Sequence, residues 1–89
     1  MTEQIEAVVR EYIGERYLSP DDAATFGNDD DLLVVLDSLQ ILRMLIDLES
    51  QFAVRIANSE LAPENLGTVS KLARLIERKL AEKEGAQAT

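Results

Sequence analysis

The segment from Ser38 to Phe52 limits the possible folds of this chain more than any other feature, because its apolar residues follow a helical period. One stripe occupies positions i, i+4, i+7 and i+11. Its members are Ile41, Leu45, Leu48 and Phe52. A second apolar line on the same segment is rotated away from this stripe and comprises Leu39, Leu42 and Ile46. The segment is therefore predicted to form a helix that is apolar on two sides, with the stripe facing a core.

The rest of the chain supplies the helices that would cover this stripe. An apolar series with a 3.6-residue period predicts a first helix that ends at Ser19-Pro20. Residues 19–37 contain six aspartates with proline and glycine, which predicts a long loop that Phe26, Leu32 and Leu33 anchor to the bundle. The segment from Ser59 to Asn65 contains a proline and supports only a short helix.

Thr68 is predicted to cap a last helix, which carries apolar residues from Val69 to Leu80. The expected fold is all-α, a small four-helix bundle of three longer helices and one short helix, with a long loop between the first two. Residues 1–83 would form this domain, and residues 84–89, which have no apolar side chain to bury beyond alanine, would form a disordered tail.

Composition excludes several classes of function. The 89 residues allow one small domain with a modest core, and they include neither cysteine nor histidine. Thiolate chemistry and a Ser–His–Asp apparatus are therefore excluded, and we do not expect an enzyme. The net charge of −8 disfavours binding to nucleic acid and anionic membranes. No apolar run approaches the length of a membrane span and no secretory signal is recognisable, so a cytoplasmic location is expected.

Leu36-Asp37-Ser38-Leu39 stands at the start of the helix that carries the apolar stripe. Asp37 and Ser38 are residue types that cap helices by accepting hydrogen bonds from the first free N–H groups. A serine at a helix start is also exposed, and the positive end of the helix dipole favours an attached phosphate. Ser38 is thus a candidate both for a cap and for a modification site.

The sequence around this serine resembles the acyl and peptidyl carrier protein family. The likeness begins at Asp-Ser-Leu, continues through Glu49-x-x-Phe52-x-Val54-x-Ile56, and ends in Thr68-Val69-x-x-Leu72-Ala73-x-Leu75-Ile76. It implies a stand-alone carrier in which Ser38, flanked by Asp37 and Leu39, bears 4′-phosphopantetheine derived from coenzyme A. The implied partners are a phosphopantetheinyl transferase, an acyl- or aminoacyl-loading ligase and downstream biosynthetic enzymes. The carrier itself would be a monomer.

The same resemblance suggests where partners and cargo bind. The expected partner surface consists of Leu39, Leu42, Arg43, Ile46 and Asp47. Arg43 departs from the acidic residue that carriers of fatty-acid synthesis usually have there, which puts their standard enzymes in doubt as partners. The residues expected to line a pocket for an acyl chain are Leu45, Leu48, Ile56 and Leu61.

Three functions stay open on the sequence. The first is a carrier of acyl thioesters for fatty-acid, polyketide or related biosynthesis. The second is a discrete aminoacyl, D-alanyl or peptidyl carrier loaded by an adenylating ligase, for which Leu36 and Arg43 leave room. The third is an acidic helical adaptor that is never modified. No dedicated metal site is predicted, because the acidic run from Asn28 to Asp31 is contiguous and lacks the alternating ligands and the glycine of a calcium loop.

Overall fold

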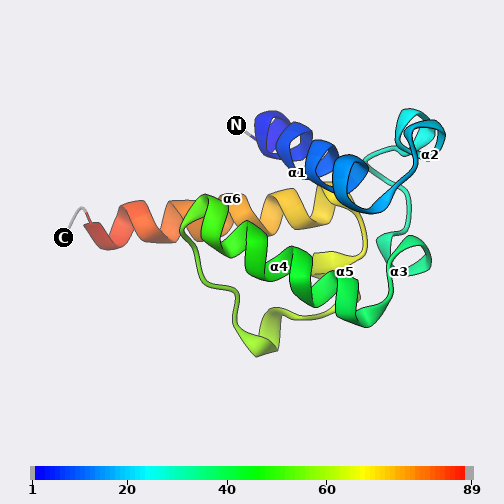
Figure 1. Ribbon diagram of the computed structural model, residues 1–89. Helices are drawn as coiled ribbons and strands as arrows, with labels where there is room; N and C mark the ends of the chain where they lie inside the picture. Colours follow the sequence, from blue (N-terminus) through cyan, green and yellow to red (C-terminus); the bar gives the residue numbers. More distant parts are fainter. Residues whose placement is uncertain (1, 88–89) are drawn as a thin grey trace.

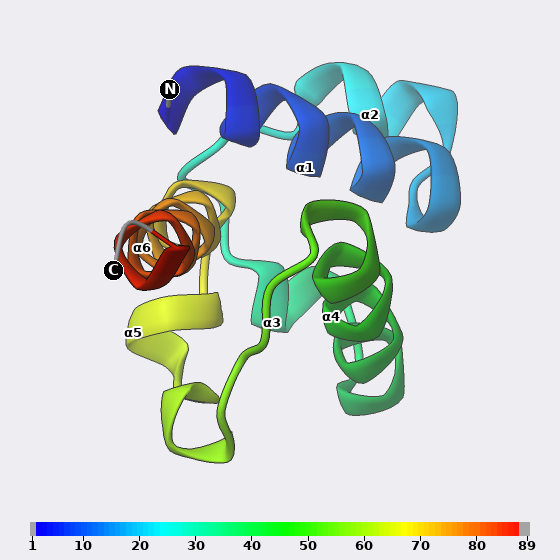
Figure 2. The ribbon, with the colours of Figure 1, turned by 90° about the vertical axis from the view of Figure 1, so that its left-hand side faces the viewer.

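Three long helices form the frame of the protein, as the computed structural model of residues 2–87 shows (Figure 1). They are α1 (Thr2–Tyr17), α4 (Ser38–Phe52) and α6 (Val69–Gln87). In Figure 2, α6 is seen nearly end-on at the left, α4 stands at the right, and α1 runs across the top. No strand occurs between residues 2 and 87, so the prediction of an all-α bundle is confirmed.

The core lies between these three helices. The predicted stripe of α4 faces it, with Ile41, Leu45 and Leu48 buried, while Phe52 is half-buried at the edge of the core. The largest fully buried side chains of the core are Val9, Ile13, Leu32, Met44, Leu48, Val69, Leu72, Leu75 and Ile76. Their burial is the main source of stability in so small a domain.

The connection between α1 and α4 is more ordered than the sequence analysis suggested. It contains two short helices, α2 (Pro20–Thr25) and α3 (Leu32–Val35), instead of an uninterrupted loop. The Ser19 hydroxyl accepts a hydrogen bond from the Asp22 N–H, and the Asp31 carboxylate accepts one from the Leu33 N–H. Ser19 and Pro20 therefore end one helix and begin the next, because a serine cap followed by proline also favours a helix start.

This connection is hydrogen-bonded to residues around the start of α6. Leu32 is fully buried, as predicted for a loop anchor, and its N–H donates to the Gly67 carbonyl at 2.8 Å. The Ser70 N–H donates to the Asn28 carbonyl at 3.0 Å. Leu33 is 43% exposed, so its prediction as an anchor is wrong. The one-turn helix α3 buries a single side chain, and Leu32 takes that position.

The segment between α4 and α6 turns back along the bundle. It begins at Ala53, which adopts the left-handed conformation with φ 54° and closes α4 through its N–H to the Glu49 carbonyl. It then forms a 3₁₀ turn, η1 (Asn58–Glu60), and the short helix α5 (Pro63–Leu66). The predicted short helix thus spans only α5, and a separate turn precedes it.

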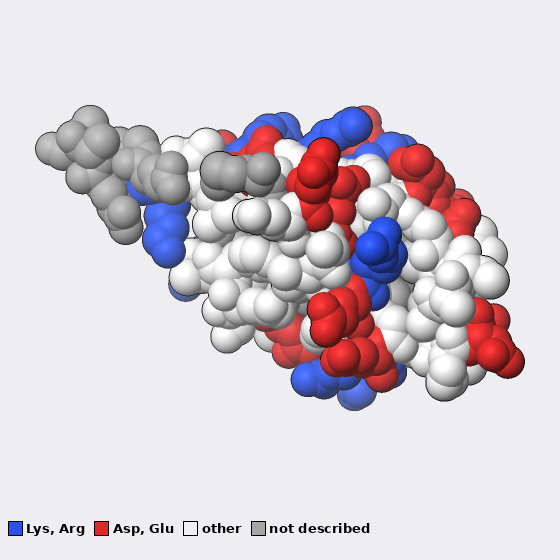
Figure 3. Space-filling model, turned by 90° about the horizontal axis from the view of Figure 1, so that it is seen from above, with Lys and Arg blue, Asp and Glu red and all other residues white. Residues whose placement is uncertain are grey.

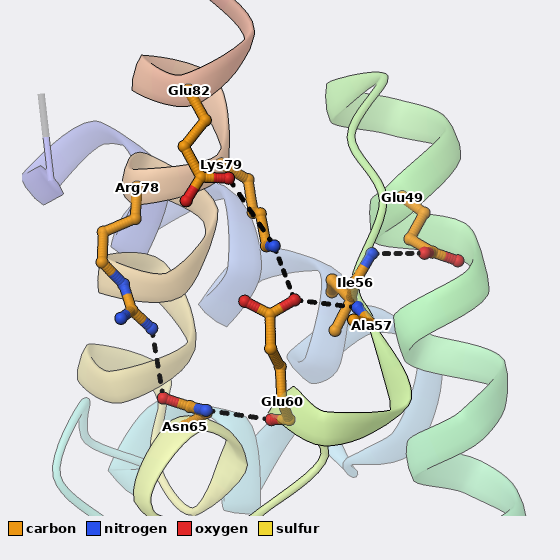
Figure 4. Close-up of polar contacts among 8 residues, drawn as sticks. All are labelled: Glu49, Ile56, Ala57, Glu60, Asn65, Arg78, Lys79 and Glu82. Carbon is orange, nitrogen blue, oxygen red and sulfur yellow. Dashed lines mark hydrogen bonds and ion pairs between the residues drawn. The ribbon is translucent and has the colours of Figure 1, made fainter.

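Carboxylates hold this segment in place (Figure 4). The Glu49 carboxylate accepts a hydrogen bond from the Ile56 N–H at 2.7 Å, and the Glu60 carboxylate accepts one from the Ala57 N–H at 2.8 Å. Glu60 also pairs with the Lys79 ammonium group of α6 at 2.6 Å. This ion pair lowers the pKa of Glu60, and the N–H of Ala57 lowers it further.

The last helix begins as the sequence indicated. The Thr68 hydroxyl accepts a hydrogen bond from the Lys71 N–H at 3.1 Å, which confirms the predicted cap. At its other end, α6 continues to Gln87, past the boundary at residue 83 drawn from the sequence. Residues 88–89 of the expected tail lie outside the described part of the chain.

Candidate functional site

Ser38 is the first residue of α4, and its side chain is exposed. The cap of this helix is Asp37, not Ser38. The Asp37 carboxylate accepts a hydrogen bond from the Gln40 N–H at 2.8 Å, and the Gln40 side chain accepts one from the Asp37 N–H at 3.0 Å. This reciprocal pair is a capping box, and it satisfies two N–H groups at the helix start. The Ser38 hydroxyl is therefore not needed for capping.

The backbone on both sides of Ser38 is fixed by the core. Leu36, one residue before the cap, is only 3% exposed, and its N–H donates to the Leu32 carbonyl at 2.8 Å. Ile41, in the first turn of α4, is buried as well. Because buried residues precede and follow it, the exposed serine sits on a short, well-supported turn at the helix end.

The electrostatics of this turn suit an anion on the serine oxygen. The N-terminus of a 15-residue helix carries partial positive charge from its free N–H groups. The Asp37 carboxylate accepts from the Gln40 N–H, and the N–H groups of Ser38 and Leu39 have no side-chain acceptor among the described residues. A phosphodiester on Ser38 would lie next to these groups.

The predicted partner line is exposed. Leu39, Leu42 and Ile46 are 59%, 49% and 62% exposed, although they belong to the same helix as the buried Met44 and Leu45. The apolar pattern predicted that Leu39, Leu42 and Ile46 turn away from the core while Leu45 faces it, and these four residues lie as predicted. Helix α3 adds further exposed apolar side chains before the serine, namely Leu33, Val34 and Val35.

Arg43 and Asp47, the charged members of the expected partner surface, line a hollow between α1 and α4 together with Ile46. Its lining residues are Arg16, Tyr17, Arg43, Ile46 and Asp47, and its volume is about 310 Å³. The contribution of α1 to this hollow was not predicted, because the apolar period of α1 indicates only which side faces the core. No signal in the sequence places Arg16 here, since its position depends on how α1 packs against α4.

The Asp47 carboxylate contacts two side chains of α1. The Tyr12 hydroxyl donates a hydrogen bond to this carboxylate, and the Arg16 guanidinium lies 4.0 Å from the same oxygen. Burial, and next the bond to Asp47, raise the pKa of the Tyr12 hydroxyl well above its ordinary value. Tyr12 therefore remains a neutral donor at physiological pH, and Asp47 links α4 to α1.

The four residues expected to line an acyl pocket are distributed over different environments. Leu48 is fully buried and Leu45 is 5% exposed, so both belong to the packed core. Ile56 is half-buried at the core margin, and Leu61 is 39% exposed. An aliphatic chain entering beside Leu48 would have to displace core side chains.

Two carboxylates of the acidic run before α3 accept hydrogen bonds from nearby backbone N–H groups. The Asp30 carboxylate accepts a hydrogen bond from the Gly27 N–H at 2.7 Å, and Asp31 caps α3. The Asn28 side chain accepts one from the Arg10 guanidinium at 3.1 Å. Within the described chain, no group of three or more acidic side chains is arranged to hold a metal ion.

Comparisons with known proteins add no family to this geometry. Neither the comparison with protein-family models nor the comparison with curated proteins gave a match. Among the described helices, none has the length and apolar character needed to cross a membrane.

Proposed function

We propose that this protein is an acyl carrier protein in which the Ser38 hydroxyl accepts 4′-phosphopantetheine from coenzyme A. The observation that carries the proposal is the placement of Ser38. It lies exposed at the start of α4 within Asp-Ser-Leu, while Asp37 alone caps the helix. The sequence resemblance to carrier proteins supports the same conclusion. The proposal places the protein in the cytoplasm, where coenzyme A is available, as a carrier and not an enzyme.

The attachment reaction uses one oxygen of this chain. The Ser38 oxygen attacks the phosphorus next to the pantetheine half of coenzyme A, a new O–P bond forms, and the bond to the adenosine bisphosphate breaks. The proton of the hydroxyl passes to a base on the transferase, because the chain has no histidine to accept it. The residues of this chain present the hydroxyl and place the helix N-terminus beside the phosphate.

The attached group supplies a terminal thiol, which holds an acyl group as a thioester. This matters for a chain that contains no cysteine of its own. The protein then carries the cargo to partner enzymes, which perform the chemistry on it. Tethering raises the effective concentration of the cargo at a docked partner. The exposed line of Leu39, Leu42 and Ile46 is proposed as the docking surface.

The experiment is incubation of the purified protein with a promiscuous phosphopantetheinyl transferase, coenzyme A and Mg²⁺, followed by mass spectrometry. The expected result is a gain of one phosphopantetheinyl group on the wild type and none on Ser38→Ala. Ser59→Ala is the matched control, because Ser59 is also exposed but lies in a 3₁₀ turn, and it should be modified like the wild type. Modification of Ser38→Ala would overturn the assignment of the site.

The outcome also separates the alternatives. No gain in mass on the wild type would favour the unmodified adaptor, for which the exposed apolar line of α4 would be the binding surface. If modification occurs, the holo protein can be offered to acyl and to aminoacyl adenylating ligases. Faster loading with an amino acid such as D-alanine would identify a discrete aminoacyl carrier instead of an acyl carrier.

A further inference from the structure

The hollow between α1 and α4 is unusual for this protein because cations line it. The chain has a net charge of −8, with 17 acidic and 9 basic residues. Two of the five residues that line the hollow are nevertheless arginines, Arg16 from α1 and Arg43 from α4. On the face seen in Figure 3, basic side chains lie beside acidic ones, with uncharged surface around them.

The charges within the hollow do not cancel. Of the described residues that line it, Asp47 alone is acidic, and its carboxylate is shared by the Tyr12 hydroxyl and Arg16. Tyr12 stays neutral, because burial and the bond to Asp47 raise its pKa. Two guanidinium groups and one carboxylate therefore line the hollow, which keeps a positive charge.

Arg16 is restrained by two neighbouring side chains. Its guanidinium lies over the Tyr12 ring at 5.4 Å from the ring centroid, as well as 4.0 Å from Asp47. Its side chain is nevertheless 65% exposed, and Arg43 is exposed as well. A guanidinium restrained by an aromatic ring and a carboxylate loses less conformational entropy when it binds a further anion.

Apolar surface continues directly from this cationic hollow. Ile46 lines it and is 62% exposed, and Leu42, one turn earlier on α4, is 49% exposed. Because Arg43 lines the same hollow as Ile46, a partner that covers Ile46 also meets the Arg43 guanidinium. A lysine or arginine of the partner at this point would meet like charge, whereas a carboxylate would meet opposite charge.

We propose that this hollow is the docking point for a partner protein whose helix presents a glutamate or aspartate beside an apolar side chain. The carboxylate would lie between Arg16 and Arg43, and the apolar side chain would cover Leu42 and Ile46. The inference builds on the proposed function by naming the chemistry of a partner. Its test uses the unmodified chain, so the two proposals can fail separately.

The test compares two synthetic amphipathic helical peptides with the same leucine stripe. One carries glutamates beside the stripe, and the other carries lysines at the same positions. Binding is followed by fluorescence anisotropy and by amide chemical shifts at low salt. The glutamate peptide should bind about fivefold more tightly than the lysine peptide and shift the amides of Arg16, Arg43 and Ile46. The preference should fade as salt is raised.

Arg43→Glu should reverse the preference, and Arg74→Glu provides the matched control. Arg74 is an exposed arginine on α6, so its replacement makes the same change in net charge without touching the hollow. Equal affinity for both peptides, absence of binding at millimolar peptide, or equal effects of the two variants would overturn the proposal. Self-association that Arg43→Glu abolishes would also overturn it, because the occupant would then be a second copy of this chain.

Discussion

Replacing two leucines of α4 by alanine separates core from surface on a single helix. Leu48 is fully buried, whereas Leu42 is 49% exposed on the proposed docking surface. Both changes remove the same atoms from the same helix. The two variants therefore differ only in the surroundings of the side chain.

The expected losses of stability follow from this difference in burial. A fully buried leucine changed to alanine costs about 2–5 kcal/mol, because the lost transfer energy adds to the energy of the cavity. At Leu42 about half of the side chain is already in water. At roughly 0.8 kcal/mol per buried methylene, the loss there is about 1 kcal/mol, and the higher helix propensity of alanine offsets part of it. With about 4–8 °C per kcal/mol for a domain of this size, Leu48→Ala should lower the Tm by at least 8 °C.

Thermal and urea unfolding monitored by circular dichroism measure these losses. The rate of transfer to or from a partner enzyme, measured at a temperature where both variants are folded, gives the second readout. We expect Leu42→Ala to slow the partner reaction while its Tm stays within a few degrees of wild type. We expect Leu48→Ala to lose stability but to react normally while folded. Comparable destabilisation by both changes would refute the reasoning, because Leu42 would then belong to the core.

Two further predictions concern the Asp37 cap of α4 and the ion pair between Glu60 and Lys79. Asp37→Ala should cost about 1 kcal/mol, because it removes the cap of α4, whereas Ser38→Ala should change the free energy of unfolding by less than about half of this; equal losses in urea unfolding would contradict the assignment of Asp37 as the cap. Glu60→Gln should weaken the contact with Lys79 and lower stability at neutral pH. Since the pKa of Glu60 in the folded state lies below its ordinary 4.5, the advantage of wild type over Glu60→Gln should be full at neutral pH and be lost as the pH falls below about 4.5 through the folded value. A pH-independent difference between the two proteins would rule this out.

The long helices could be predicted because each repeats its apolar pattern over several turns. Ile41, Leu45 and Leu48 are spaced so that only a helix buries all three, and the structure buries them. Helices α2 and α3 are too short to show a period. Their caps, Ser19 and Asp31, were visible in the sequence, but serine and aspartate are as common in loops as at helix starts.

The candidate site likewise has features that could be predicted from the sequence and features that could not. The exposure of Leu42 and its neighbours followed from the pattern on one helix. The Arg16 side of the hollow did not, because it depends on how α1 crosses α4. The contact of Tyr12 with Asp47 and that of Glu60 with Lys79 likewise join separate elements, and no local pattern specifies such pairs.

The backbone bonds that fix the connection before Ser38 have a consequence for the order of events during synthesis. Leu32 and Asn28 bond to Gly67 and Ser70, so the turn that presents the serine is completed by the last third of the chain. Contacts between residues distant in sequence form late, because a long loop must close first. A nascent chain still lacking α6 would expose Ser38 without its supporting structure. A modifying enzyme that recognises the folded turn would therefore act only after α6 has emerged from the ribosome and packed against this connection.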